Sequence, residues 1–291
     1  MRFLFPKDSS RRFRVLAGIG AALVGLLGAV AAGEVAVEAA DLETVKRRGY
    51  FIVGVKENLP LLGLRQPDGS LQGFEIDLAQ ALSQHILDSA TPPQWVPLLN
   101  QDRLAKVMSG EVDLAIANLT PTDARRRVVE FSLPYLSSRT GFITTVPAPL
   151  RFADLARLRL GLLQGSVAIG RVRAAFPQAT LVGLDTYEQA QQGLEQGTVE
   201  VFAGDELMLR GWLAPTQAPR ASLTSGRLLP VGLGYDARAI ALPKGLQYET
   251  LRQAVNQGLR SLEHEGRLQQ MRKEWQLPPL AAASLDRLEE D

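Results

Sequence analysis

The stretch Asp113-Leu-Ala-Ile-Ala-Asn-Leu-Thr-Pro-Thr-Asp-Ala-Arg125 places a short apolar run directly before a polar turn. The run at residues 113–117 predicts a buried strand, and the residues from Pro121 onward predict a turn that leads into a helix. The Thr120 hydroxyl, the free N–H groups of the turn and the Arg125 guanidinium can then reach one point. A bidentate guanidinium with neutral donors binds a small carboxylate without a metal. A capped turn with a solvated arginine is the alternative interpretation, and this stretch alone does not separate the two.

The composition limits the number of domains and excludes several kinds of functional site. The 291 residues are 46% hydrophobic and 22% charged, which is enough chain for two modest domains. A net charge of +1 gives no field that points to nucleic acid. The absence of cysteine excludes thiolate catalysis, disulfides, cysteine-based zinc sites and a lipid-modified cysteine anchor. His85 and His264 have no metal-ligating partner at a useful spacing, so we expect neither a metal nor a cofactor.

The N-terminus has the pattern of an export signal. Residues 1–14 carry five basic residues, residues 15–32 carry no charge, and small residues follow as far as Ala39. This order predicts a signal peptide within residues 1–39 and a periplasmic protein. The alternative is an uncleaved anchor that holds the protein to the membrane, because an apolar run of this length is at the lower limit of a span. No other segment of the sequence is apolar and long enough to cross a bilayer, so we do not expect a channel or permease.

Short apolar strands alternate with helices in two consecutive blocks, which predicts an α/β protein with parallel sheets. In the first block we expect strands at residues 51–55, 95–99 and 113–117, then extended stretches at 128–131 and 140–146 that Pro134 and Tyr135 separate. In the second block we expect strands at residues 159–163, 180–184 and 199–203. A loop-rich segment at 214–230, a strand at 238–242, a helix over 245–275 and a disordered tail from Pro278 complete the prediction.

Three polar loops follow the carboxyl ends of these predicted strands. They are residues 118–125 in the first block and Gly165-Ser166 and Gly204-Asp205 in the second. Ligands of open α/β sheets bind outside the carboxyl ends of strands. A cleft between the blocks would therefore bring the three loops together.

Several motifs together resemble the bacterial extracellular solute-binding proteins, family 3, which serve ABC importers of polar amino acids. The motifs are Gly73-Phe-Glu-Ile-Asp-Leu-Ala79, the run from Ser109 to Arg125, and Val129-Glu-Phe-Ser-Leu-Pro-Tyr135. The resemblance covers roughly residues 41–275. It implies a type II periplasmic binding protein fold, in which two α/β lobes joined by two hinge strands close on the ligand. Lobe 1 would comprise residues 41–142 and 239–277, lobe 2 residues 147–236, and the hinges would lie near residues 142–145 and 239–242.

The same resemblance implies the site and the partners. Arg125 would clamp the α-carboxylate of a free L-amino acid, assisted by Thr120 and the backbone near Asn118. Ser166 would add donors from the second lobe, and Asp205 would accept from the α-ammonium. The partners implied are an amino acid and the permease subunits of an ABC transporter in the cytoplasmic membrane, with no nucleic acid, and the protein is expected to be a monomer.

The loop after the first predicted strand departs from the family pattern. Leu59 stands where many relatives place an aromatic residue and Lys56 where an acidic residue is frequent; after the second predicted strand, Asn100 stands where an apolar or aromatic wall residue is common. We expect this loop to set the preference for the ligand side chain. Lys56 would favour an acidic or amide ligand and Glu57 a basic one, and the sequence does not decide between them.

Two other classes of function are compatible with the pattern. A periplasmic dehydratase of the cyclohexadienyl or arogenate type would use the same arginine and add a general acid, for which Glu57 or Asp205 are candidates. No paired carboxylates stand out in the sequence, so we expect a binding protein with no catalytic residues. A ligand-sensing domain of a receptor is the other alternative, since a fold does not fix a function.

Overall fold

The computed structural model describes residues 39–213, 223 and 225–280. All but the last residue of the predicted signal peptide, most of the 214–230 segment and the end of the predicted tail lie outside this range. Within it, none of the helices combines the length and the apolar character that a membrane crossing requires.

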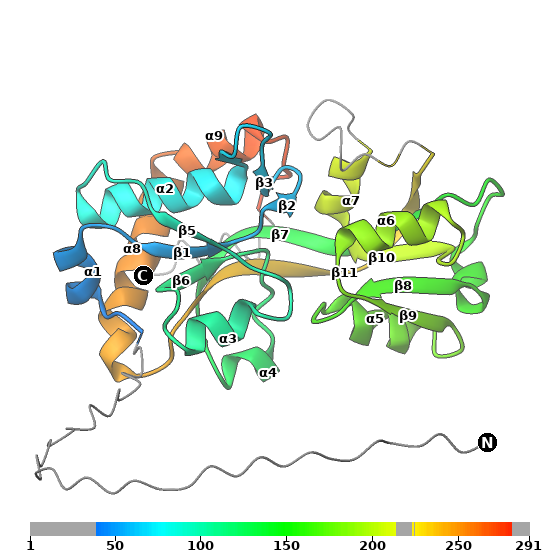
Figure 1. Ribbon diagram of the computed structural model, residues 1–291, viewed down its shortest axis with the longest axis horizontal. Helices are drawn as coiled ribbons and strands as arrows, with labels where there is room; N and C mark the ends of the chain where they lie inside the picture. The colour runs from blue at the N-terminus through cyan, green and yellow to red at the C-terminus, as the bar shows by residue number, and fades with distance from the viewer. Residues whose placement is uncertain (1–38, 214–222, 224, 281–291) are drawn as a thin grey trace, which may run out of the picture. The chain divides into compact units, whose positions relative to one another are not determined.

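Two kinds of element build the fold, and Figure 1 labels them along the chain. The α-helices are α1 Leu42–Arg48, α2 Phe74–Leu87, α3 Arg103–Met108, α4 Asp123–Arg126, α5 Ala168–Ala175, α6 Tyr187–Glu195, α7 Glu206–Trp212, α8 Glu249–His264 and α9 Arg267–Glu274. The strands are β1 Ile52–Val55, β2 Asn58–Leu59, β3 Gly63–Arg65, β4 Leu71–Gln72, β5 Gln94–Pro97, β6 Leu114–Ile116, β7 Glu130–Thr144, β8 Arg159–Leu163, β9 Thr180–Leu184, β10 Val201–Asp205 and β11 Arg227–Leu242. Short 3-10 helices cover Phe152–Arg157 and Leu246–Tyr248.

One mixed sheet runs through both blocks in the strand order β5-β1-β6-β11-β7-β10-β8-β9. Strands β5, β1 and β6 are parallel to one another, as are β10, β8 and β9. The long strands β7 and β11 lie between these two sets and run antiparallel to each other and to their neighbours β10 and β6. The parallel strands predicted within each block are confirmed, and the antiparallel pair β7 and β11 joins the two sets into one mixed sheet. The predicted α/β class is confirmed.

Strand β7 is continuous where the sequence predicts a break. Its 15 residues include Pro134, which pairs with Ala239 of β11 where the register of the two strands shifts. Proline lacks the N–H that a ladder requires, and such irregularities are where a strand tolerates it. The two extended stretches predicted on either side of Pro134 are thus one strand. The predicted hinge residues 142–145 and 239–242 lie at or next to the ends of β7 and β11.

The C-terminal helix is also divided differently from the prediction. Gly266 adopts a φ of +73° between α8 and α9, a left-handed conformation that stops a helix at no cost to glycine. After α9 the chain stays packed, since Leu280 is only 4% exposed. Residues 278–280 of the predicted tail are described, with Leu280 in the core, and the rest of the tail lies outside the described residues.

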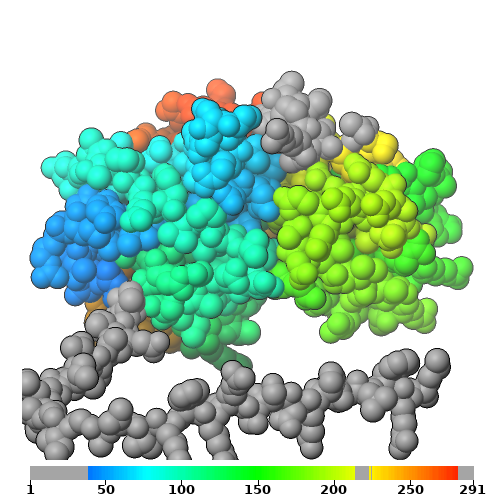
Figure 2. Space-filling view, in the orientation of Figure 1, coloured from blue at the N-terminus to red at the C-terminus, as the bar shows by residue number. Residues whose placement is uncertain are grey.

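Helices cover both faces of the sheet in each block (Figure 1). In the first block, α2 and α3 both contact β1, and α2 packs against α8 and α9. In the second block, α5 contacts β8 and β10 as α6 does, and Trp212 of α7 stacks on Phe202 with ring centroids 5.4 Å apart. In Figure 2 the surfaces of the two blocks lie directly against each other on the face shown. This arrangement directs the loops after β6, β8 and β10 to a common place.

Candidate ligand-binding site

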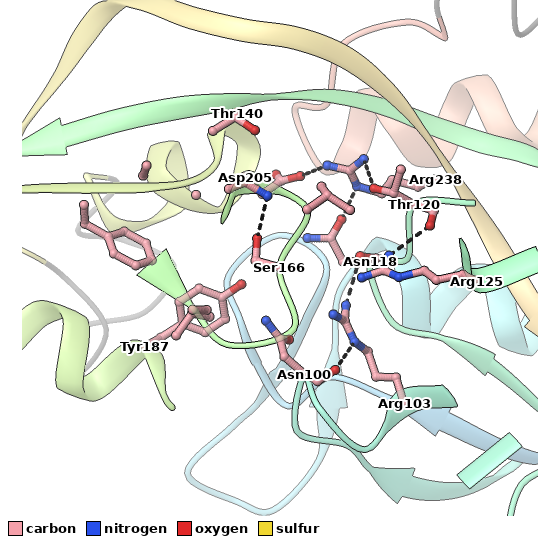
Figure 3. A pocket seen from close by; sticks show the side chains of 16 residues that line it. Asn100, Arg103, Asn118, Thr120, Arg125, Thr140, Ser166, Tyr187, Asp205 and Arg238 are labelled. Carbon is pink, nitrogen blue, oxygen red and sulfur yellow. Dashed lines mark hydrogen bonds and ion pairs between the residues drawn. The ribbon is translucent and has the colours of Figure 1, made fainter. Parts of the chain in front are cut away.

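A small cavity lies where the loops after β6, β8 and β10 meet strand β11 (Figure 3). Five of the predicted site residues line it: Asn118, Thr120, Arg125, Ser166 and Asp205. The structure thus brings together the groups from the two blocks, as the position of their loops predicts. Their contact with a ligand stays a prediction.

Lys56 does not line this cavity, contrary to the prediction. Its side chain is buried, and its Nζ donates to the Leu98 carbonyl at 2.6 Å. Burial, and then the positive charge of Arg103, lower the pKa of Lys56 to about 8. The side chain turns beneath the loop that follows β5 because the aliphatic stem packs inward where β1 ends.

Glu57 does not reach the cavity either. Its Oε2 pairs with Arg65 Nε at 2.6 Å, and both side chains are about 40% exposed. The pair belongs to the small antiparallel sheet of β2, β3 and β4. Leu59, at the position where many relatives place an aromatic residue, is 1% exposed and belongs to the hydrophobic core. The aromatic lining instead comes from Tyr187 and Phe202 of the second block.

Arg125 is held by backbone carbonyls rather than by a carboxylate. Its Nη1 donates to the Thr120 carbonyl and its Nη2 to the Gly165 carbonyl, both at 2.9 Å. The first contact lies within the 118–125 loop, and the second crosses to the loop after β8. Burial, and then the nearby charge of Arg238, lower the pKa of Arg125. Because it forms no ion pair with any described residue, this guanidinium is suited to bind an added anion.

Arg238 is a residue that the sequence did not reveal as part of the site. From strand β11 it donates through Nη1 to Thr120 Oγ1 at 2.9 Å, through Nε to Asn118 Oδ1, and through Nη2 to Asp205. One buried guanidinium therefore holds three of the predicted ligand groups (Figure 3). Since the Thr120 oxygen accepts from Arg238, its own O–H remains able to donate. The only signal in the sequence was a charged residue directly before the apolar residues 239–242.

Asp205 has two roles in the structure. Its Oδ1 accepts from the N–H groups of Leu207 and Met208 at 3.0 and 3.3 Å, which caps helix α7. Its Oδ2 pairs with Arg238. A ligand ammonium at this carboxylate would therefore share it with a protein cation.

Arg103 is the second residue of the cavity that was missed. Its Nε donates to the Asn100 carbonyl at 3.0 Å, and its Nη1 donates to the carbonyls of Ala117 and Asn118 at 2.9 and 3.1 Å. Burial, and then the positive charge of Arg125, lower the pKa of Arg103 to about 10. Its place in the loop region after strand β5, at the carboxyl edge of the sheet, was a usable signal.

The backbone of Asn118 is fixed from behind by buried polar groups. Asn118 has a φ of +51°, a left-handed conformation that asparagine tolerates better than most residues. Its N–H donates to Glu75 Oε1 at 2.8 Å, and that oxygen also accepts from the Tyr135 hydroxyl at 2.5 Å. Burial raises the pKa of the Glu75 carboxyl. Glu75 and Tyr135, each from a motif quoted above, therefore position the loop and do not touch the cavity.

Ser166 has the local role that its position suggested, and it also lines the cavity. Its Oγ accepts from Ala168 N–H at 3.1 Å at the start of α5. Within the described residues, no group of three or more His, Asp or Glu side chains is arranged to hold a metal ion. The charged and hydroxyl groups that line the cavity are guanidinium groups, hydroxyls and one carboxylate. This set of groups suits the recognition of a carboxylate.

Residues 51–278 match the model of the bacterial extracellular solute-binding proteins, family 3. The chain belongs to this family. The matched range includes every strand of the large sheet and every residue of the cavity. By the family's description, the chain is an extracellular solute-binding protein.

Several characterised proteins are similar to this solute-binding protein. It is 28% identical over 276 residues to the L-cystine-binding protein of Escherichia coli, and the alignment covers 87% of this chain and 94% of the relative. It is 24% identical over 237 residues to the glutamine-binding protein of a Bacillus subtilis ABC transporter, covering 80% and 84% of the two chains. A crystal structure of the solute receptor for L-cysteine of Neisseria gonorrhoeae aligns with a TM-score of 0.72 and 26% identity, covering 81% and 93%. These likenesses confirm the predicted type II periplasmic fold.

Proposed function

We propose that this solute-binding protein binds a free L-amino acid between its two blocks and delivers it to the permease subunits of an ABC importer. The observation that carries the proposal is Arg125, a half-buried guanidinium with no carboxylate partner among the described residues, which lines a cavity with hydroxyl donors from both blocks. The relatives named above bind L-cystine, glutamine and L-cysteine, which supports an amino acid as the ligand class.

The ligand's two charged ends match the two kinds of group in the cavity. The α-carboxylate binds Arg125 and accepts from the Thr120 hydroxyl and from donors at Ser166. The α-ammonium donates to Asp205 Oδ2, next to the guanidinium of Arg238. Because these groups come from both blocks, a zwitterion bridges the blocks and favours their closed arrangement.

The remaining features of the proposal follow from this role. The two blocks act as lobes, with residues 41–142 and 239–277 in one and 147–236 in the other, and β7 and β11 act as hinge strands. The protein works as a monomer in the periplasm, where the signal peptide at residues 1–39 directs it. It binds its ligand without chemical turnover, which the names of the relatives above support, since they are names of binding proteins and not of enzymes.

A thermal-shift screen of the twenty amino acids against the purified exported protein tests the proposal. A ligand at 100 times its Kd stabilises the folded state by about 2.7 kcal/mol, which gives an easily measured rise in Tm. We expect a rise with at least one L-amino acid, its loss in Arg125→Ala, and its retention in Arg127→Ala, an exposed neighbour on the same turn. If no amino acid raises the Tm, the proposed function is wrong.

A further inference from the structure

The cavity contains more positive than negative charge. Its charged lining residues are Arg103, Arg125 and Arg238 on one side and Asp205 on the other. The three guanidinium groups and the carboxylate give a formal charge of +2 at neutral pH. A zwitterionic ligand adds no net charge and would leave this excess in place.

The excess belongs to two of the three arginines. Arg238 is paired with Asp205, so these two charges compensate each other. Arg103 and Arg125 donate only to backbone carbonyls, and neither forms an ion pair with a described side chain. Their guanidinium groups lie close enough on the cavity wall for the charge of Arg125 to lower the pKa of Arg103 (Figure 3). A buried cation (Arg103) beside a half-buried one (Arg125), both without counter-ions, is costly unless an anion joins them.

The acidic residues around the cavity do not remove this excess. Asp236 approaches Arg238 at 3.9 Å but is itself paired with Arg171. Glu75 lies behind the Asn118 loop and is fully buried, which raises the pKa of its carboxyl and so favours its neutral form. Lys56, also buried nearby, adds positive charge rather than negative.

We propose that the ligand is an acidic L-amino acid, with its α-carboxylate on Arg125 and its side-chain carboxylate on Arg103. The inference rests on the proposed function and specifies the substrate class of the same site. Among the described residues, Nη2 of Arg103 has no protein acceptor, so its guanidinium keeps donors for a carboxylate while Nε and Nη1 hold the loop. An amide in the same place would leave the charge of Arg103 uncompensated.

Isothermal titration calorimetry at pH 7 with matched acid and amide ligands tests this inference. The probes are L-glutamate against L-glutamine and L-aspartate against L-asparagine, which differ little in shape but by one charge. We expect at least one of the two acids to bind about ten-fold or more tightly than its amide, which is the effect of a single charge-assisted contact of about 1.4 kcal/mol. If both amides bind as tightly as their acids or more tightly, the inference is wrong.

Variants then assign the preference to Arg103. In Arg103→Gln the acid-to-amide affinity ratio should fall about ten-fold, whereas Arg103→Lys should keep most of the ratio because it keeps the charge while losing the loop contacts. Arg125→Lys should weaken acid and amide together and leave the ratio unchanged. A ratio that Arg103→Gln does not alter, in protein whose circular dichroism matches the wild type, would show that Arg103 is not the partner.

The outcomes for the two proposals are separable. Binding of some other amino acid, with neither acid bound, refutes the acidic ligand and supports the proposed function. Binding of glutarate, a dicarboxylate without an amine, with no amino acid bound, refutes the proposed function but supports two anion-binding arginines. No binding of any of these compounds refutes both.

Discussion

Arg125 is the residue on which the proposed site depends most directly. Its guanidinium is fixed by the carbonyls of Thr120 and Gly165, so the side chain is already oriented before a ligand arrives. Lysine would keep the charge but lose the planar pair of donors that matches a carboxylate. We expect Arg125→Lys to weaken binding of the best amino acid from the screen by about ten- to one-hundred-fold, the effect of one charged hydrogen bond of about 1.5–3 kcal/mol. Calorimetry measures the change; Arg127→Lys is the control, and unchanged affinity in Arg125→Lys contradicts the clamp.

The buried ammonium of Lys56 should affect the pH dependence of stability rather than ligand binding. Burial lowers the pKa of its ammonium to about 8 in the folded protein, against an ordinary lysine pKa of 10.5 in the unfolded chain. Between these two values the unfolded chain binds more protons than the folded one, so the free energy of unfolding rises with pH. Over pH 8 to 9.5 we expect a rise of up to about 2 kcal/mol from this residue. Urea unfolding at several pH values should show the rise in the wild type and a flatter profile in Lys56→Met, and identical profiles would contradict the burial argument.

At the scale of elements, the start of helix α2 depends on one glycine. Gly73 has a φ of +141°, and a Cβ at this position would lie 2.2 Å from the Leu62 carbonyl oxygen. Both the conformation and the close approach of backbone exclude a side chain. We expect Gly73→Ala to lower the free energy of unfolding by about 2 kcal/mol or more.

Gly170 provides the matched control within helix α5. A Cβ there meets no atom within 4 Å, and its φ is not in the left-handed range. Gly170→Ala should be neutral or stabilise by about 0.5–1 kcal/mol, because alanine loses less backbone entropy in a helix. Urea unfolding of both variants decides the matter, and a Gly73→Ala protein as stable as Gly170→Ala would contradict the assigned role of Gly73.

Local patterns predicted the elements better than their connection. Asp41 caps α1 by accepting from Thr44 N–H at 2.8 Å, and Gly49 ends that helix at a φ of +81°. Such signals depend on neighbouring residues and can be seen in one chain. The antiparallel path of β7 and β11 depends on pairing between residues more than 80 positions apart, for which hydrophobic alternation carries no information.

The residues of the candidate site likewise fall into two groups: those that local patterns predict and those that only strand pairing brings to the cavity. Arg125 and Thr120 occur in a motif and Asp205 in a polar loop after a predicted strand, so the sequence predicted their place in the cavity. Arg238 reaches Asn118 across 120 positions of sequence, and only the pairing of β11 beside β6 brings the two together. Lys56 was misplaced because its position in the chain indicates a loop at the sheet edge but not the direction of its side chain.

At the scale of the whole molecule, two charged side chains connect the blocks across the cavity. Arg125 reaches the Gly165 carbonyl in the second block, and Arg238 joins Thr120 of the first block to Asp205 of the second. Strands β7 and β11 pass from one block to the other, and their register shifts between Leu228 and Gly232 and between Leu233 and Tyr235. Irregularities of this kind let a strand bend, so the connection combines a flexible hinge with polar contacts that a ligand can strengthen.

Closure of the blocks on the ligand is the last prediction, and the absence of cysteine makes it simple to test. Gln80 on α2 and Gln178 after α5 are exposed and belong to different blocks, so Gln80→Cys and Gln178→Cys together accept a pair of spin labels. Double electron–electron resonance measures the distance between the two labels. We expect the distribution of this distance to become narrower and to shift to one population on saturation with the best amino acid, because the ligand binds groups of both blocks. Asp205→Asn should broaden the ligand-free distribution, since it removes the ion pair with Arg238 that crosses the cavity. A double label placed within the first block, at Gln80 and Ser109, should not respond to the ligand, and an inter-block distribution that saturating ligand leaves unchanged would contradict closure.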